Sequence, residues 1–124
     1  VREVAFVPFA GVTITWDAYA ARVREALAPL GVGVRALHAV DDAAAYLHDA
    51  AAVAVGGGNT FHLLAELQRR RLLAPLRARA LGGMPYVGWS AGSVVACPTL
   101  QTTNDMPIVA PPDGFGALAL VGVQ

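Results

Sequence analysis

The chain has 124 residues and a mass of 12.8 kDa, and its nine basic and nine acidic side chains give a formal net charge of +0. This balance excludes a global field that would attract nucleic acid or an anionic membrane. A hydrophobic content of 56% with a mean hydropathy of +0.51 excludes a disordered chain. The length predicts a single domain over residues 1–124.

Cys97 is the only cysteine, which excludes an intrachain disulfide framework and suits a reducing compartment. No apolar run reaches membrane-spanning length, and the start of the chain has no signal-peptide layout. The arginines between residues 69 and 79 are expected on a solvated helix surface, because no aromatic platform for nucleic acid is interleaved with them. We therefore expect a cytoplasmic protein that binds neither membrane nor nucleic acid.

Apolar runs and helical stripes alternate along the chain. Residues 4–9 predict a buried strand, and the apolar spacing from Trp16 to Leu30 predicts a helix with Thr15 as N-cap and Gly31 at its end. The elements expected next are a strand at 32–37, a helix from 41 or 42 to 49, a strand at 51–55, helices at 61–71 and 74–81, a strand at 84–87, a helical stretch at 93–97 and a last strand at 118–123. This alternation predicts βαβ units and an open, doubly wound, mainly parallel α/β sheet.

The most informative motif is Gly88-Trp89-Ser90-Ala91-Gly92, which follows an apolar strand and precedes a helical stretch. Strand, sharp turn and helix are the context of a G-x-S-x-G nucleophile elbow, in which a strained serine holds its hydroxyl clear of the sheet. We expect glycine on both sides of the serine because a side chain there would collide with the neighbouring strand or helix. The alternative is a tight strand-to-helix turn without a catalytic role.

A second turn, Gly56-Gly57-Gly58-Asn59-Thr60, also joins a strand to a helix. It lacks the glycine spacing of a dinucleotide fingerprint and the lysine of a phosphate-binding loop, so no cofactor is predicted, and no metal site either. The carboxyl ends of parallel strands share one edge of the sheet, so we expect the two turns to meet there. Ala91 N–H is then one oxyanion donor, and Gly58 N–H is the natural second one.

A nucleophilic serine needs a general base, and the chain contains His38, His48 and His62. We expect His38 and His48 to be surface or packing residues. His62 is expected in the first turn of a helix, whose positive end disfavours the imidazolium that a base must become. No histidine follows Ser90, so the catalytic set is incomplete within this chain.

Together these motifs resemble the peptidase E family of alpha-aspartyl dipeptidases. The resemblance rests on residues 56–61, 88–92 and 102–109, with further matches at 6–13 and 16–17, and it covers nearly the whole chain. It implies a flavodoxin-like fold similar to class I glutamine amidotransferases, with serine in place of their cysteine. It also implies hydrolysis of dipeptides that begin with aspartate (Asp-X).

By the same resemblance, Ser90 is the nucleophile, and Gly58 and Ala91 supply the oxyanion N–H groups. The substrate-binding candidates are Asn59, Thr60 and Asn104. Asp105 matches an acidic position that is a candidate for the third member of the triad, although family members carry a downstream glutamate that could fill this role. Asp105 is equally compatible with a turn-forming residue in a polar loop. Ser93 departs from the family pattern, and we expect it to face the helix interior.

The resemblance also implies a sheet that is incomplete at both ends. The family begins with one more strand before Val1 and continues well past Gln124, with its histidine base in an Asn-Pro-His stretch just after this chain ends. We therefore expect this chain to be inactive alone and to bind the remaining C-terminal segment as a companion chain, with a homodimer left open. The alternatives are a cyanophycinase-like serine hydrolase and a non-catalytic fragment or binding module of the same fold.

Overall fold

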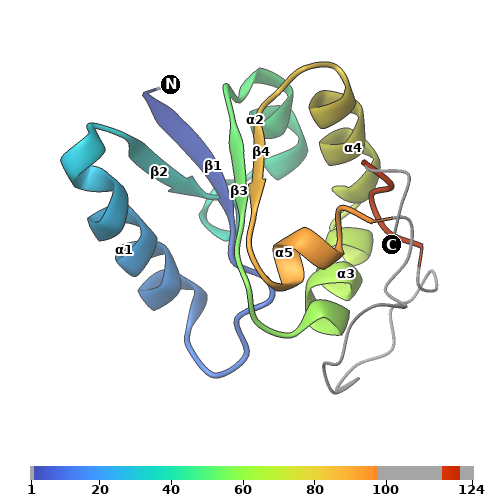
Figure 1. Ribbon diagram of the computed structural model, residues 1–124, viewed down its shortest axis with the longest axis horizontal. Coiled ribbons are helices and arrows are strands. Elements are labelled where there is room, and N and C mark those ends of the chain that lie inside the picture. Colours follow the sequence, from blue (N-terminus) through green and yellow to red (C-terminus); the bar gives the residue numbers. More distant parts are fainter. Residues whose placement is uncertain (1, 98–115, 121–124) are drawn as a thin grey trace.

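The computed structural model describes residues 2–97 and 116–120. Its strands are β1 (Glu3–Val7), β2 (Gly33–Ala36), β3 (Val53–Val55) and β4 (Tyr86–Gly88). They form a parallel sheet in the order β2-β1-β3-β4 (Figure 1). The helices are α1 (Trp16–Leu27), α2 (Ala43–Asp49), α3 (Thr60–Arg69), α4 (Leu73–Leu81) and α5 (Ala91–Val94), with 3-10 turns η1 (Ala28–Leu30) and η2 (Leu37–Ala39). The predicted open, parallel α/β sheet is confirmed.

Capping side chains place the helix starts where the sequence predicts them. The Thr15 side chain accepts a hydrogen bond from Ala18 N–H at the start of α1, and Asp42, rather than Asp41, caps α2. The first helix is shorter than predicted because the chain tightens into η1 after Leu27. Gly31, with φ of +71°, then ends that turn in the left-handed conformation that glycine adopts without strain.

The two faces of the sheet are covered unequally. Alternate residues of β1 point to opposite faces, so Val7 joins a large core with side chains from α2, α3, α4 and α5, whereas Phe6 joins a small core with α1. Figure 1 shows α1 on one side of the sheet and helices α3 and α4 on the other. The chain leaves β1 toward β2 on one side and returns to β3 on the other side. The space between β1 and β3 is therefore the topological switch point of the sheet.

The predicted final strand is wrong for the residues that can be compared. Leu118–Leu120 pack against the end of α5, where Leu118 N–H donates to Val95 O at 2.9 Å and Leu120 N–H donates to Ala96 O at 2.7 Å. The apolar run thus satisfies carbonyl groups that the end of α5 leaves unpaired, instead of extending the sheet. Residues 121–124 lie outside the described ranges. Within those ranges, no helix has both the length and the apolar character needed to cross a membrane.

Candidate active site

The turns that follow β1, β3 and β4 meet at the carboxyl-end edge of the sheet. Asn59 N–H, in the turn after β3, donates to Ala10 O, in the turn after β1, at 2.7 Å. Gly57 lies directly against the elbow, since a Cβ atom built on it would be 2.9 Å from Ser90 Cβ. The sequence prediction that the two glycine-rich turns meet is confirmed, and they meet beside the switch point, where open α/β sheets bind ligands.

Ser90 has the strained backbone expected of a nucleophile elbow. Its φ of +55° and ψ of −115° lie outside the usual regions for a residue with a side chain, which costs about 1–3 kcal/mol. The residue is exposed, and its carbonyl accepts hydrogen bonds from Ser93 N–H at 2.9 Å and Val94 N–H at 3.1 Å. The strain therefore exposes the side chain at the start of α5 while the backbone stays anchored.

The two glycines of the elbow are required by backbone contacts. A Cβ on Gly92 would lie 2.1 Å from Val55 O of β3, and a Cβ on Gly88 would lie 2.6 Å from the carbonyl oxygen of Gly92. Neither contact can be relieved by turning a side chain, because both neighbours are main-chain atoms. The predicted collision with the strand and the helix is confirmed at both positions.

Two hydroxyl groups hold the elbow in place, a role that the sequence did not indicate for either of them. Ser93 Oγ donates to Gly88 O at 2.8 Å, and the Tyr86 hydroxyl donates to Gly92 O at 2.6 Å. Ser93 is exposed, which corrects the expectation that it faces the helix interior. Burial raises the pKa of Tyr86, so its phenol remains a neutral donor. The sequence signal that could have indicated the Tyr86 bond is a tyrosine within a predicted strand, because a tyrosine with a buried ring needs a hydrogen-bond partner for its hydroxyl.

The two predicted oxyanion donors lie on adjoining turns. Ala91 is the first residue of α5, so its N–H has no helix carbonyl four residues earlier. Gly58 has φ of +142°, and a Cβ there would lie 2.1 Å from Ala10 O, so the turn accepts only glycine. A cavity of about 500 Å³ opens beside Gly58, and Tyr19 and Arg22 of α1 form part of its wall. The role of both N–H groups as oxyanion donors stays a prediction.

The substrate-binding candidates fall in different surroundings. Asn59 is half-buried and lines the same cavity, and its side chain accepts a hydrogen bond from His62 N–H as the N-cap of α3. Thr60 is only 1% exposed and does not line this cavity. Asn104 and Asp105 lie outside the described residues.

The three histidines bind partners other than Ser90. The recorded bonds join His38 Nε2 to Asp17 Oδ1 at 2.6 Å, His48 Nδ1 to Asp49 Oδ1 at 3.2 Å, and His62 Nδ1 to Phe9 O at 2.6 Å. Within residues 2–97 and 116–120, no histidine forms a hydrogen bond with the Ser90 hydroxyl, and no group of three His, Cys, Asp or Glu side chains could hold a metal ion. A nucleophile at Ser90 would need a base from elsewhere.

An open parallel sheet with a strained Gly-x-Ser-x-Gly turn at its carboxyl-end edge defines an α/β protein of the nucleophile-elbow class. The chain belongs to peptidase family S51, whose family model matches residues 1–124. The resemblance to peptidase E is thereby confirmed.

The individual relatives agree with this assignment. A peptidase E of Citrobacter koseri is 56% identical over 123 residues, and one of Salmonella typhimurium is 54% identical over the same length. Each match covers 99% of this chain and 53% of the relative, so the chain spans about half the length of the curated relatives it matches. A crystal structure from Listeria monocytogenes EGD-e, described as a peptidase E protein, matches with a TM-score of 0.75 at 30% identity. That match covers 97% of this chain and 63% of the Listeria chain.

Proposed function

We propose that this chain carries the nucleophile of a serine peptidase that hydrolyses Asp-X dipeptides. The observation that carries the proposal is Ser90, which is exposed at a strained φ of +55° and lies against the Gly57 turn. Backbone strain of this size persists only where surrounding contacts enforce it, and such positions cluster at active sites. Membership of family S51 supports peptide hydrolysis as the reaction.

The proposed reaction is acyl transfer in two steps. Ser90 Oγ attacks the carbonyl carbon of the aspartyl residue, its proton passes to a base outside the described residues, and the carbonyl oxygen becomes an oxyanion. The N–H groups of Ala91 and Gly58 donate to that oxyanion. The base then protonates the leaving amine as the C–N bond breaks, and water hydrolyses the acyl-serine to release aspartate. Asp105 or an acid on the companion segment proposed below orients the base.

Specificity for aspartate needs a cation near the elbow, and our candidate is Arg22. It lines the cavity of about 500 Å³ together with Gly58 and Asn59. Its side chain is exposed and forms no ion pair or hydrogen bond with any residue that the structure describes. A guanidinium can bind a carboxylate through two parallel hydrogen bonds. We assign Arg22 to the side-chain carboxylate of the N-terminal aspartate.

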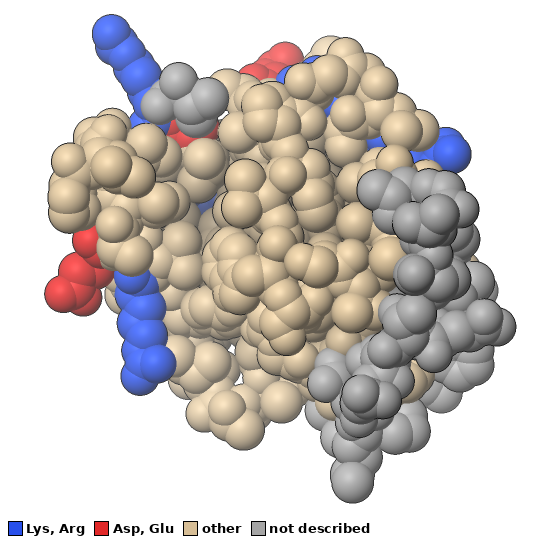
Figure 2. All heavy atoms as spheres, in the orientation of Figure 1, with Lys and Arg blue, Asp and Glu red and all other residues tan. Residues whose placement is uncertain are grey.

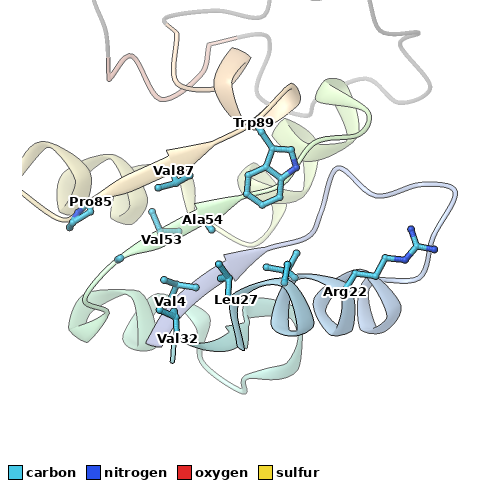
Figure 3. Close-up of a pocket in the computed structure, with 12 residues that line it drawn as sticks. Val4, Arg22, Leu27, Val32, Val53, Ala54, Pro85, Val87 and Trp89 are labelled. Atoms are coloured by element: carbon cyan, nitrogen blue, oxygen red, sulfur yellow. The ribbon is translucent and has the colours of Figure 1, made fainter. Parts of the chain in front are cut away.

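The base is proposed to come from a companion segment that completes the sheet. A groove of about 490 Å³ runs between α1 and strands β3 and β4, and its lining is almost wholly apolar. Figure 2 shows uncharged side chains across the middle of this view of the molecule, with charged atoms toward its margins. Figure 3 shows Val87 and Trp89 of the β4 segment facing Leu27 of α1 across the groove. Val87 is 59% exposed and Trp89 is 39% exposed.

This apolar face lies beside the outer edge of β4, which pairs only with β3 among the described strands. Unpaired strand edges and apolar faces are normally covered. A segment that continues the sheet past β4 and lays an apolar helix face in the groove would cover both. The relatives, about twice as long as this chain, have the length to supply it. Val87→Glu should prevent assembly with that segment and abolish activity, whereas Leu81→Glu, at an exposed site on α4, should not.

The test is hydrolysis by this chain with and without the part of the Citrobacter koseri peptidase E that lies outside the matched region. We expect release of aspartate from Asp-Leu only in the mixture, with far slower release from Asn-Leu. Faster hydrolysis of aspartyl polymers than of Asp-Leu would favour a cyanophycinase-like hydrolase instead. A stable mixture that hydrolyses neither substrate would favour a non-catalytic module.

A further inference from the structure

Tyr19 lies on α1, but its hydroxyl reaches the glycine turn after β3. It donates to Gly57 O at 3.0 Å, and its ring packs edge-on against Phe6 with centroids 5.0 Å apart. Gly56 makes room for this hydroxyl, because a Cβ atom there would lie 2.4 Å from the Tyr19 oxygen. Burial raises the pKa of Tyr19, so its hydroxyl stays protonated and able to donate at neutral pH.

The oxygen that Tyr19 binds belongs to the peptide unit that carries Gly58 N–H. A peptide unit is planar, and the described part of the chain has no cis peptide bond. In a trans unit the C=O and the N–H point in opposite directions, so a bond that fixes Gly57 O also fixes the direction of Gly58 N–H. The same unit lies against the elbow, where a Cβ on Gly57 would be 2.9 Å from Ser90 Cβ.

This peptide unit needs an external restraint. It is flanked by glycines, whose backbone rotates through conformations that other residues rarely adopt. An oxyanion donor is effective when it is oriented before the reaction begins, because no energy is then spent on turning it during the reaction.

We propose that Tyr19 is a positioning residue, whose hydroxyl holds the Gly57–Gly58 peptide so that Gly58 N–H is oriented toward the oxyanion in advance. The inference rests on the proposed function, since Gly58 N–H has this task only if Ser90 is a nucleophile. Tyr19 itself touches no reacting atom.

The experiment is Tyr19→Phe in the complete protein, that is, this chain with the segment that completes it. Phenylalanine keeps the ring contact with Phe6 and removes only the hydroxyl. We expect kcat for Asp-Leu to fall about tenfold with KM changed less than about twofold, a smaller loss than the 10²–10³-fold typical of deleting an oxyanion donor outright. Affinity for an aspartyl aldehyde, which forms a tetrahedral adduct with the serine, should fall as much as kcat/KM, while affinity for the product aspartate stays unchanged.

Tyr46→Phe is the matched control. The Tyr46 hydroxyl donates to the Glu3 carboxylate at the amino-end edge of the sheet, away from the elbow, so its loss should leave kcat and both affinities unchanged. The ratio of aldehyde to aspartate affinity does not depend on how much of the protein is folded, so partial unfolding cannot imitate the expected effect.

The outcomes separate the two proposals. If Ser90→Ala abolishes hydrolysis but Tyr19→Phe leaves kcat and the affinity ratio unchanged, the role of Tyr19 is refuted and the nucleophile stands. If the Ser90→Ala protein still hydrolyses Asp-Leu at a rate comparable to that of the parent, the proposed function is wrong. The role of Tyr19 is then refuted as well.

Discussion

Substitution of Gly92 by alanine should destabilise the protein and inactivate it together. The added Cβ would lie 2.1 Å from Val55 O and 2.8 Å from Val55 C, so α5 and β3 must separate by about 1 Å to reach an ordinary contact. Overpacking of this kind costs about 3 kcal/mol when no side chain can move aside. Alanine recovers about 1 kcal/mol, because it is a better helix former and restricts the unfolded chain.

The expected net loss is about 2 kcal/mol, which corresponds to a fall in the melting temperature of about 4–8 °C for a complete protein about twice as long as this chain. The rate of hydrolysis should fall about 10²-fold, which is more than the loss of stability alone would cause. The reason is that α5 begins directly after Ser90, and a displacement of about 1 Å can reduce a catalysed rate by this factor. Both quantities are measured on the complete protein, by thermal unfolding and by hydrolysis of Asp-Leu well below the melting temperature.

Gly33→Ala is the control for this substitution. Gly33 lies in β2, and the nearest atom to an added Cβ is Arg2 O at an ordinary 3.6 Å, so the variant should melt within about 2 °C of the parent and keep its activity. A Gly92→Ala variant that melts no lower than Gly33→Ala and hydrolyses Asp-Leu at the parental rate would contradict this prediction.

Three further predictions concern the donors, the substrate cation and pH. Gly58→Ala should reduce kcat about 10²–10³-fold, because its Cβ would clash with the backbone of the turn after β1, whereas Gly31→Ala, also at positive φ but with open space around it, should leave kcat unchanged. Arg22→Gln should raise KM for Asp-Leu at least tenfold and reduce the ratio of kcat/KM for Asp-Leu to that for Asn-Leu. Arg77→Gln on α4 should change neither quantity. Equal KM values in both variants would contradict the assignment of Arg22 to the substrate carboxylate. The free energy of unfolding should fall as pH rises above about 10, because burial raises the pKa of Tyr86 in the folded protein and the unfolded chain therefore loses the phenol proton at a lower pH. Tyr86→Phe should reduce this dependence of the free energy of unfolding on pH, as measured by urea titration.

Much of the elbow was predictable because its constraints are local. Glycine at 88 and 92 indicates backbone contacts that are too close for any side chain. The order of strand, turn and helix around Ser90 predicts its strained backbone. The capping residues Thr15 and Asp42 likewise fixed two helix starts, since an N-cap acts on an N–H only three residues away.

The features that the sequence did not predict depend on contacts between residues far apart in the sequence. Tyr19 has the spacing of a residue in an apolar helical stripe, and nothing in that spacing indicates that its hydroxyl binds a carbonyl 38 residues later. The run at Leu118 is apolar enough for a strand, but periodicity does not say whether a buried segment pairs with a strand or with the end of a helix. His62 is not assigned as the general base, because a hydrogen bond between its Nδ1 and Phe9 O holds the imidazole ring.

We infer that Ser90 is a nucleophile, that its strained turn exposes its hydroxyl, and that a companion segment supplies its base. The most direct measurement is kcat/KM for Asp-Leu with Ser90→Ala in the complete protein, beside a check that its melting temperature is unchanged. We predict a loss of about 10⁴-fold or more, as expected when a covalent nucleophile is removed. A folded Ser90→Ala protein that keeps kcat/KM within about tenfold of the parent would contradict it.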